Sequence, residues 1–420
     1  MAAKYTAPRG TYDMLPTESH AWQHVVRTFQ NTVELFNYRE IRTPMFEETD
    51  LFVRTSGDTS EVVTKQMYTF KDKGDRSITL KPEGTAPVMR ALIEHGMLGQ
   101  GQINRCWYYL PVFRYERPQK GRCRQHHQVG VELVGSPSPN ADAEVIEVAS
   151  RFYAALGIEG LEVNINCIGR AETRDRFRTA LLGYLDSWLK DQDEEGRAKV
   201  LKNPLRLFDS KDEKVLELMK GAPTVDQSLE DASKAHFDGV LAALSEAGIP
   251  YQVDPHIVRG LDYYTDTVFE LLGRNLGAQS TLCGGGRYDN LIKEIGGAPT
   301  PSVGFGGGIE RLMIVLESLN LIPAAKTLPV YLVAACEEAR VPVKTLAHKL
   351  REAGIACVYD LDGRNLKQQF KQADREGARF TAILGETELA NGSVSLKDMS
   401  STEQSELSVE SMMKKLVSAH

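Results

Sequence analysis

The pattern of the sequence changes near residue 170, and this change constrains the fold more than any other feature. Before it, apolar residues recur at helical or strand spacing, with strand-like segments around 66–70, 77–81, 106–114 and 127–134. From about 170 to 247, charged and leucine-rich helical sequence replaces them, and strand-like segments resume at 267–272 and 279–283. The pattern therefore predicts a helical insertion or a small helical subdomain.

Two amphipathic helices are predicted before that change. The first spans about 18–37, where apolar residues recur at three- and four-residue steps, and Thr17 or Ser19 is its candidate N-cap. The second is expected to be capped by Asn140 and to stop at Gly157, because glycine readily ends a helix.

A separate small α/β domain is predicted after a linker at 323–327, since strand-like and helical segments alternate there as β-α-β-α-β. One of its predicted helices carries a basic stripe at four-residue spacing, formed by Lys367, Lys371 and Arg375, with Leu366, Phe370 and Ala373 facing inward. Such a stripe is usually a solvated face, and a nucleic-acid contact becomes credible only with support from the rest of the chain.

The composition excludes several classes of protein. The 420 residues are enough for two or three domains, and 42% apolar with 25% charged residues is ordinary for a globular protein. A net charge of −7 means that any nucleic acid must be bound by local patches. The six cysteines are scattered without a C-x-x-C pair, which favours free thiols in a reducing cytoplasm over disulfides or zinc. No apolar run is long enough to span a membrane, and none is expected.

Three clusters of arginine, tyrosine and glycine follow one another closely at 259–264, 283–289 and 304–311. Arginine offers a fixed charged fork to carboxylate or phosphate, glycine lets a ligand approach the backbone, and tyrosine hydroxyls can bond a polar ring. The clusters therefore favour a site for a polyanion and a small polar substrate. The glycines at 304–308 are expected to precede a helix whose first amides suit phosphate, although neither G-x-G-x-x-G nor the P-loop pattern is matched.

Two further segments carry possible ligand groups, each with a simpler alternative. A basic loop between two strands at 113–132 could hold a nucleoside triphosphate, or it could be an exposed hairpin with solvated arginines. The segment 81–85 offers a carboxylate and a hydroxyl suited to an ammonium group, or an ordinary turn. For 259–264, the alternative to a ligand site is an arginine on a loop, followed by tyrosines that belong to the core.

Together these segments resemble the histidyl-tRNA synthetases, a family of class II aminoacyl-tRNA synthetases. Residues 38–46 are similar to class II motif 1, 113–132 to motif 2 and 304–311 to motif 3. The two histidine-specific signatures resemble 259–264 and 285–289.

The resemblance implies an α+β catalytic domain with an antiparallel sheet flanked by helices, a helical insertion and a C-terminal α/β anticodon-binding domain. The catalytic domain would comprise 1–169 and 248–322, the insertion 170–247 and the anticodon-binding domain 328–420. It also implies a cytoplasmic homodimer that forms through motif 1.

The implied reaction has two steps. L-histidine and ATP give histidyl-adenylate and pyrophosphate, with Mg²⁺ on the outer phosphates, and the histidyl group then passes to the 3′-hydroxyl of the terminal adenosine of tRNA(His). A non-catalytic histidine-sensing paralogue, such as the regulatory subunit of ATP phosphoribosyltransferase, is the alternative. A class II synthetase for another amino acid conflicts with the paired histidine signatures.

The resemblance also implies a role for each matched residue. Arg259 and Arg114 would be catalytic, with Arg259 neutralising charge beside the α-phosphate where relatives use a metal ion. No residue is expected to ligate a metal. Histidine would be bound by Glu83, Gly84, Thr85, Gln128, Glu132, Tyr263, Tyr264 and Tyr288. ATP would be bound by Arg114, Glu116, Arg122, His126 and Arg311. The tRNA would meet Arg124, Lys367, Lys371 and Arg375.

Two residues depart from the family pattern. Lys81 stands where most relatives have arginine, and His126 stands where a phenylalanine usually stacks under adenine. An imidazole offers less apolar area for stacking than a phenyl ring, so the adenine contact is the part of the site that this departure affects.

Overall fold

A computed structural model describes residues 4–56, 60, 62–202, 204–210, 212–255, 257, 263–274 and 281–418. Arg259, the predicted catalytic arginine, lies outside the described residues. The chain divides into two compact units, Met1–Pro323 and Ala324–His420, and each is described by itself.

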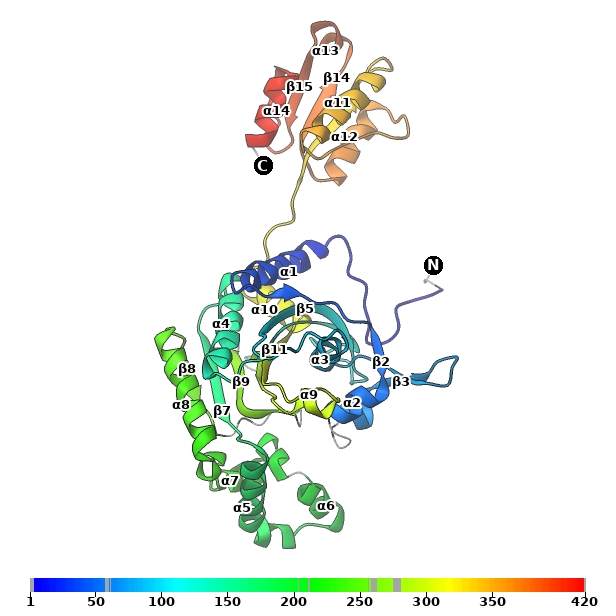
Figure 1. The fold of residues 1–420 in the computed structure, drawn as a ribbon. Coiled ribbons are helices and arrows are strands. Elements are labelled where there is room, and N and C mark those ends of the chain that lie inside the picture. Colours follow the sequence, from blue (N-terminus) through cyan, green and yellow to red (C-terminus); the bar gives the residue numbers. More distant parts are fainter. Residues whose placement is uncertain are drawn as a thin grey trace. The chain divides into compact units, whose positions relative to one another are not determined.

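The first unit is built on a sheet of eight strands among the described residues, shown in Figure 1. Their order is β1 (Arg39–Glu40), β5 (Asn104–Phe113), β6 (Gln125–Val134), β11 (Ser302–Gly308), β10 (Thr281–Arg287), β9 (Thr265–Gly273), β7 (Leu161–Cys167) and β8 (Tyr251–Val253). All pairs are antiparallel except β1 with β5 and β7 with β8, at the two edges. The predicted antiparallel sheet flanked by helices is confirmed.

Both predicted helices of the first part are present, but their caps differ from the prediction. Helix α1 (Ser19–Glu34) follows Glu18, which makes no side-chain cap bond, so neither Thr17 nor Ser19 caps it. Helix α4 (Pro139–Ala155) is capped by Ser138, whose side chain accepts a hydrogen bond from the Asn140 amide, so the Asn140 cap was wrong by two residues. Proline at the first helical position explains this start, because its φ is already helical.

Helices cover one face of the sheet. Side chains of α1, α4 and α10 (Ile309–Ser318) share one apolar core with Val129, Val131 and Leu133 of β6. Phe29 of α1 packs edge-on against Phe152 of α4 and Phe305 of β11. The strand residues that alternate with these point to the opposite face, where the sheet curves around α3 (Thr85–Glu94) (Figure 1).

Smaller elements lie beside that second face. They are α2 (Thr49–Ser56), a π-helix (Val62–Gln66), α9 (Leu291–Glu294) and a three-stranded sheet ordered β2 (Phe46–Glu48), β4 (Ser77–Leu80), β3 (Tyr68–Lys71). A second apolar cluster joins α3 and α9 to Tyr108, Tyr263, Tyr264 and Tyr288.

The segment from 170 to 247 contains helices and no strand among its described residues. It comprises α5 (Ala171–Lys190), α6 (Glu194–Lys202), a 3-10 helix (Pro204–Asp209), α7 (Glu213–Met219), a 3-10 helix (Val225–Ser228) and α8 (Asp231–Glu246). Phe177, Leu181 and Leu185 of α5 pack with Val215 and Met219 of α7 in a small core, while α8 contributes to the core under the main sheet.

The second unit contains the predicted β-α-β-α-β alternation and two strands that were not predicted. Its sheet is ordered β13 (Cys357–Tyr359), β12 (Leu328–Ala334), β14 (Ala378–Leu384), β15 (Ser393–Asp398), β16 (Gln404–Ser408), with the first three parallel. The helices are α11 (Arg340–Glu352), α12 (Leu366–Arg375), α13 (Glu386–Asn391) and α14 (Val409–Ser418). None of the helices in the described parts of the chain is long and apolar enough to cross a membrane.

The basic stripe of α12 is exposed, but one predicted inward residue is not buried. Leu366 is 41% exposed, whereas Gln369 is buried and bonds both the amide and the carbonyl of Ala334. Leu366 is the first residue of the helix, directly after the Asn365 cap, and the buried face of the helix begins at Gln369.

Candidate active site

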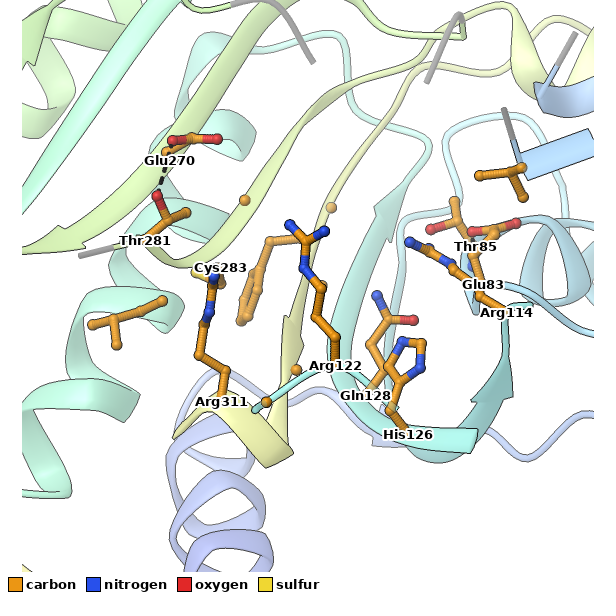
Figure 2. Close-up of a pocket in the computed structure, with 18 of the residues that line it drawn as sticks. Glu83, Thr85, Arg114, Arg122, His126, Gln128, Glu270, Thr281, Cys283 and Arg311 are labelled. Carbon is orange, nitrogen blue, oxygen red and sulfur yellow. Dashed lines mark hydrogen bonds between the residues drawn. The ribbon is translucent and has the colours of Figure 1, made fainter. Parts of the chain in front are cut away.

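A cavity of about 590 Å³ opens on the face of the sheet opposite α1 and α4. Its floor is formed by β6, β9, β10 and β11, and its walls by the start of α3 and the loop that joins β5 to β6. Figure 2 shows Glu83, Thr85 and Arg114 on one side of the cavity and Glu270 and Thr281 on the other, with Arg122 and Arg311 drawn between them.

The glycines at 304–308 form strand β11, which leads directly into α10 at Ile309. The predicted helix after the glycines is therefore confirmed, and phosphate binding at its start stays a prediction. A Cβ on Gly304 would lie 2.1 Å from Glu132 Oε2, and one on Gly306 would lie 2.1 Å from Gln128 Nε2. The glycines therefore leave room over the strand for polar side chains from β6 and for a ligand. They could not be recognised as a strand by side-chain alternation, because glycine has no side chain.

Glu83 and Thr85 are fixed at the beginning of α3. The carboxylate of Glu83 accepts hydrogen bonds from the amides of Thr85 at 2.7 Å and Ala86 at 2.8 Å. Burial raises the pKa of Glu83, and the two amides oppose that shift. Gly84 lets this turn pack on Tyr108, since a Cβ there would lie 2.6 Å from the tyrosine ring.

Gln128 completes this end of the cavity. Its Oε1 is buried and has no hydrogen-bond partner within the described structure, which is costly unless a ligand supplies a donor. Glu83, Thr85 and Gln128 all line the cavity, so the structure brings together the three residues predicted to receive an ammonium group.

Tyr263, Tyr264 and Tyr288 also line the cavity and pack edge to face. Glu132 lies behind them, fully buried, and does not line the cavity. Its carboxylate accepts from Thr85 Oγ1, Tyr108 OH and Tyr288 OH. Burial raises the pKa of Glu132 to about 8, against the effect of those hydroxyls. A direct bond from Glu132 to a ligand therefore stays a prediction that requires these hydroxyls to turn.

The cavity also holds cationic groups. Arg114 donates from Nε to the Pro82 carbonyl at 2.8 Å, and Arg122 lies 3.8 Å from the Glu116 carboxylate. Arg311 enters from the first turn of α10. Three guanidinium groups facing one cavity can bind a polyanion such as a triphosphate.

His126 lies on β6 beside these arginines and lines the cavity (Figure 2). Burial and the Arg114 charge lower the pKa of His126 to about 4, so the ring is neutral near pH 7. A neutral ring can stack on a base but adds no charge for phosphate.

Arg311 and His126 are positioned by Glu310. Its carboxylate accepts from the His127 amide at 2.9 Å and from Tyr12 OH at 3.0 Å, on the face of the sheet away from the cavity. The bond from the His127 amide fixes the first turn of α10 against β6. The neighbouring residues His126 and Gln128 of β6 point into the cavity.

Some signature residues lie elsewhere. Arg287 is 1% exposed and bonds Asp142, together with the carbonyls of Ser136 and Ser138. It therefore fixes the end of β10 to the start of α4 and does not face the ligand. Arg124 lies with its guanidinium 3.8 Å from the centre of the Tyr115 ring, outside the cavity lining.

Glu270, Thr281 and Cys283 line the cavity, although no individual role was predicted for them from the sequence. Glu270 Oε2 accepts from Thr281 Oγ1 at 3.3 Å. Glu270 is the charged residue in an otherwise apolar strand segment, and that position in the sequence could have identified it.

The chain is similar to known proteins over almost its whole length. The family model for histidyl-tRNA synthetase matches residues 10–312, and the anticodon binding domain model matches 322–419. A histidine–tRNA ligase of Geobacillus sp. is 46% identical over 97% of this chain and 98% of that protein. A histidine–tRNA ligase of Synechococcus elongatus is 45% identical over 96% of this chain and 93% of that protein.

A solved structure agrees with these relatives. The apo histidyl-tRNA synthetase of S. aureus has a TM-score of 0.82 at 37% identity and covers 98% of this chain and 99% of its own. The resemblance noted in the sequence is thus confirmed, and the chain belongs to the histidyl-tRNA synthetase family.

Proposed function

We propose that the chain is a histidine–tRNA ligase that activates L-histidine with ATP and then transfers the histidyl group to the terminal adenosine of tRNA(His). The observation that carries the proposal is a single cavity with carboxylate and amide acceptors at one end and three arginines around the rest. An amino acid and a nucleoside triphosphate need these two kinds of group side by side, because the carboxylate of one attacks the α-phosphorus of the other.

Histidine is proposed to bind at the Glu83 end. Glu83, Thr85 and the unpaired Gln128 Oε1 accept from its ammonium group, which places the side chain toward Tyr263 and Tyr264. Polar groups that bond both ring nitrogens are left unpaired by other amino acids. A site of this type can reject competitors by ~10⁴-fold.

ATP is proposed to bind across the arginines. Arg114, beside Glu83, suits the α-phosphate, and Arg122 and Arg311 suit the outer phosphates. Arg259 is proposed to neutralise charge on the α-phosphate during attack, and His126 to stack on adenine. Glu270 and Thr281 offer the carboxylate and hydroxyl oxygens that Mg²⁺ takes beside phosphates, and bound Mg²⁺ would neutralise the pyrophosphate leaving group.

The anticodon arm of the tRNA is proposed to contact the exposed stripe formed by Lys367, Lys371 and Arg375. The acceptor end is proposed to contact Arg124. Reversing all three charges of the stripe is expected to raise the KM for tRNA while sparing pyrophosphate exchange. Loss of both activities would remove this assignment.

The homodimer is proposed to form through motif 1, where Met45 and Phe46 are 46% and 53% exposed in the single chain. Adjacent exposed apolar side chains are typical of a surface that a partner covers. A cytoplasmic location fits the six free cysteines.

Exchange of labelled pyrophosphate into ATP tests the proposed function. The expected result is exchange that depends on L-histidine and is absent with each other amino acid. A histidine-sensing paralogue would bind histidine without exchange, and a synthetase for another amino acid would exchange with that amino acid instead.

A further inference from the structure

Asp266 has an unusual place in the fold, two residues after the cavity-lining Tyr264. It is 1% exposed and has a φ of +48°, in the left-handed region that asparagine and aspartate enter more readily than most side chains. The pairing of β9 with β10 is irregular here, since Val268 faces Gly286 but Thr265 faces Arg287. Bulges of this kind change the direction of neighbouring side chains.

The carboxylate of Asp266 is held by residues at the starts of the first and last helices of the helical segment, α5 and α8. Ser233, in the first turn of α8, donates to Oδ1 at 2.5 Å. Arg170, the residue before α5, donates to Oδ2 at 3.2 Å. The backbone of Asp266 is also fixed, because its amide donates to the Gly169 carbonyl and its carbonyl accepts from the Ile168 amide.

The same helical segment bonds the adjoining tyrosine. Arg174 of α5 donates from Nη1 to the Tyr264 carbonyl at 3.2 Å. The Tyr264 ring lies close against the backbone of β10, since a Cβ on Gly286 would lie 2.9 Å from a ring carbon. A shift of the backbone at 264–266 would therefore move the ring within the cavity.

We propose that Asp266 is a positioning residue through which α5 and α8 set the place of Tyr264, and hence the affinity for histidine. This inference rests on the proposed function. The phosphate end of the cavity is built by Arg311 of α10 and Arg122 of the loop between β5 and β6. Removing the bonds of Asp266 is therefore expected to raise the KM for histidine and leave the KM for ATP unchanged.

The test measures KM for histidine and for ATP in pyrophosphate exchange. Asp266→Ala is expected to raise the KM for histidine about tenfold while the KM for ATP stays within twofold. Asp266→Asn is expected to recover most of the loss, because asparagine tolerates positive φ and can still accept from Ser233. Ser233→Ala, which removes one of the two side-chain bonds, is expected to raise the KM for histidine about threefold.

Glu162→Gln is the matched control, because it removes the ion pair between β7 and Arg274 at the far end of β9. Wild-type chain without histidine-dependent exchange would refute the proposed function itself. If wild type and Glu162→Gln both exchange normally, the proposed function stands. The inference alone is then refuted when Asp266→Ala leaves the KM for histidine unchanged or raises the KM values for histidine and ATP equally. Should Asp266→Ala fail to fold by circular dichroism, an unchanged KM for histidine in Ser233→Ala overturns the inference.

Discussion

Replacing Gly306 by alanine tests whether the glycines of β11 keep space for Gln128. The new methyl group would lie 2.1 Å from Gln128 Nε2 and 3.0 Å from its Cδ, and its three nearest neighbours all belong to that one flexible side chain. The amide of Gln128 must therefore move, while the backbone stays. At Gly304, by contrast, a methyl group would also lie 2.4 Å from the Val131 carbonyl.

The expected cost follows from the bond that Gln128 is proposed to make. A hydrogen bond to a charged group contributes about 1.5–3 kcal/mol. At about 1.4 kcal/mol per tenfold change, Gly306→Ala should raise the KM for histidine about ten- to hundredfold. The KM for ATP should change little, because Gln128 lies at the Glu83 end of the cavity.

Pyrophosphate exchange by wild type, Gly306→Ala, Gln128→Ala and the double variant provides the assay. If the methyl group acts by displacing Gln128, the double variant should be no worse than Gln128→Ala, and the two costs should not add. Additive costs, or a KM for ATP that rises as much as that for histidine, would refute the reasoning. Similar melting temperatures of all four proteins would show that the fold is kept.

Three further predictions concern buried or cavity-lining groups. Asp142→Asn removes the fully buried one of the two carboxylates that pair with Arg287, leaving the partly exposed Asp289, and should lower the free energy of unfolding by up to about 3–5 kcal/mol, measured by urea denaturation; a loss below 1 kcal/mol would contradict this. His126→Phe should lower the KM for ATP, since phenyl offers more area for stacking than a neutral imidazole, and an unchanged KM would mean that this ring does not stack. Glu132 keeps its proton up to about pH 8 when folded but loses it near pH 4.5 when unfolded, so its ionisation lowers stability as pH rises between these values. The melting temperature of Glu132→Gln relative to wild type should therefore increase from pH 5 to pH 8.5, and a constant difference would show that Glu132 is already ionised at pH 5.

Local patterns predicted the elements of the fold well. The apolar spacing of α1 and the strand-like pattern of β6 depend on neighbouring residues alone, and both elements lie where they were expected. The caps were harder, because Ser138 and Asn140 are equally good candidates until the position of Pro139 is taken into account.

The site was predicted in part. The sequence identified residues that the fold brings into one cavity, from Glu83 to Arg311, because each belongs to a recognisable motif. It did not separate ligand-facing residues from supporting ones. Arg287 bonds Asp142, which is 145 residues away in the sequence, and Glu132 is covered by Tyr288, which follows β10. Such long-range contacts decide which side of a strand faces the ligand, and no local pattern contains them.

A crystal structure of the chain with bound L-histidine would show whether the cavity is the histidine site. The ammonium group of histidine is expected within hydrogen-bond distance of Glu83 and Gln128, with the imidazole ring beside Tyr264. Histidine bound outside this cavity, or reversed with its ammonium group toward Arg122 and Arg311, would contradict this expectation.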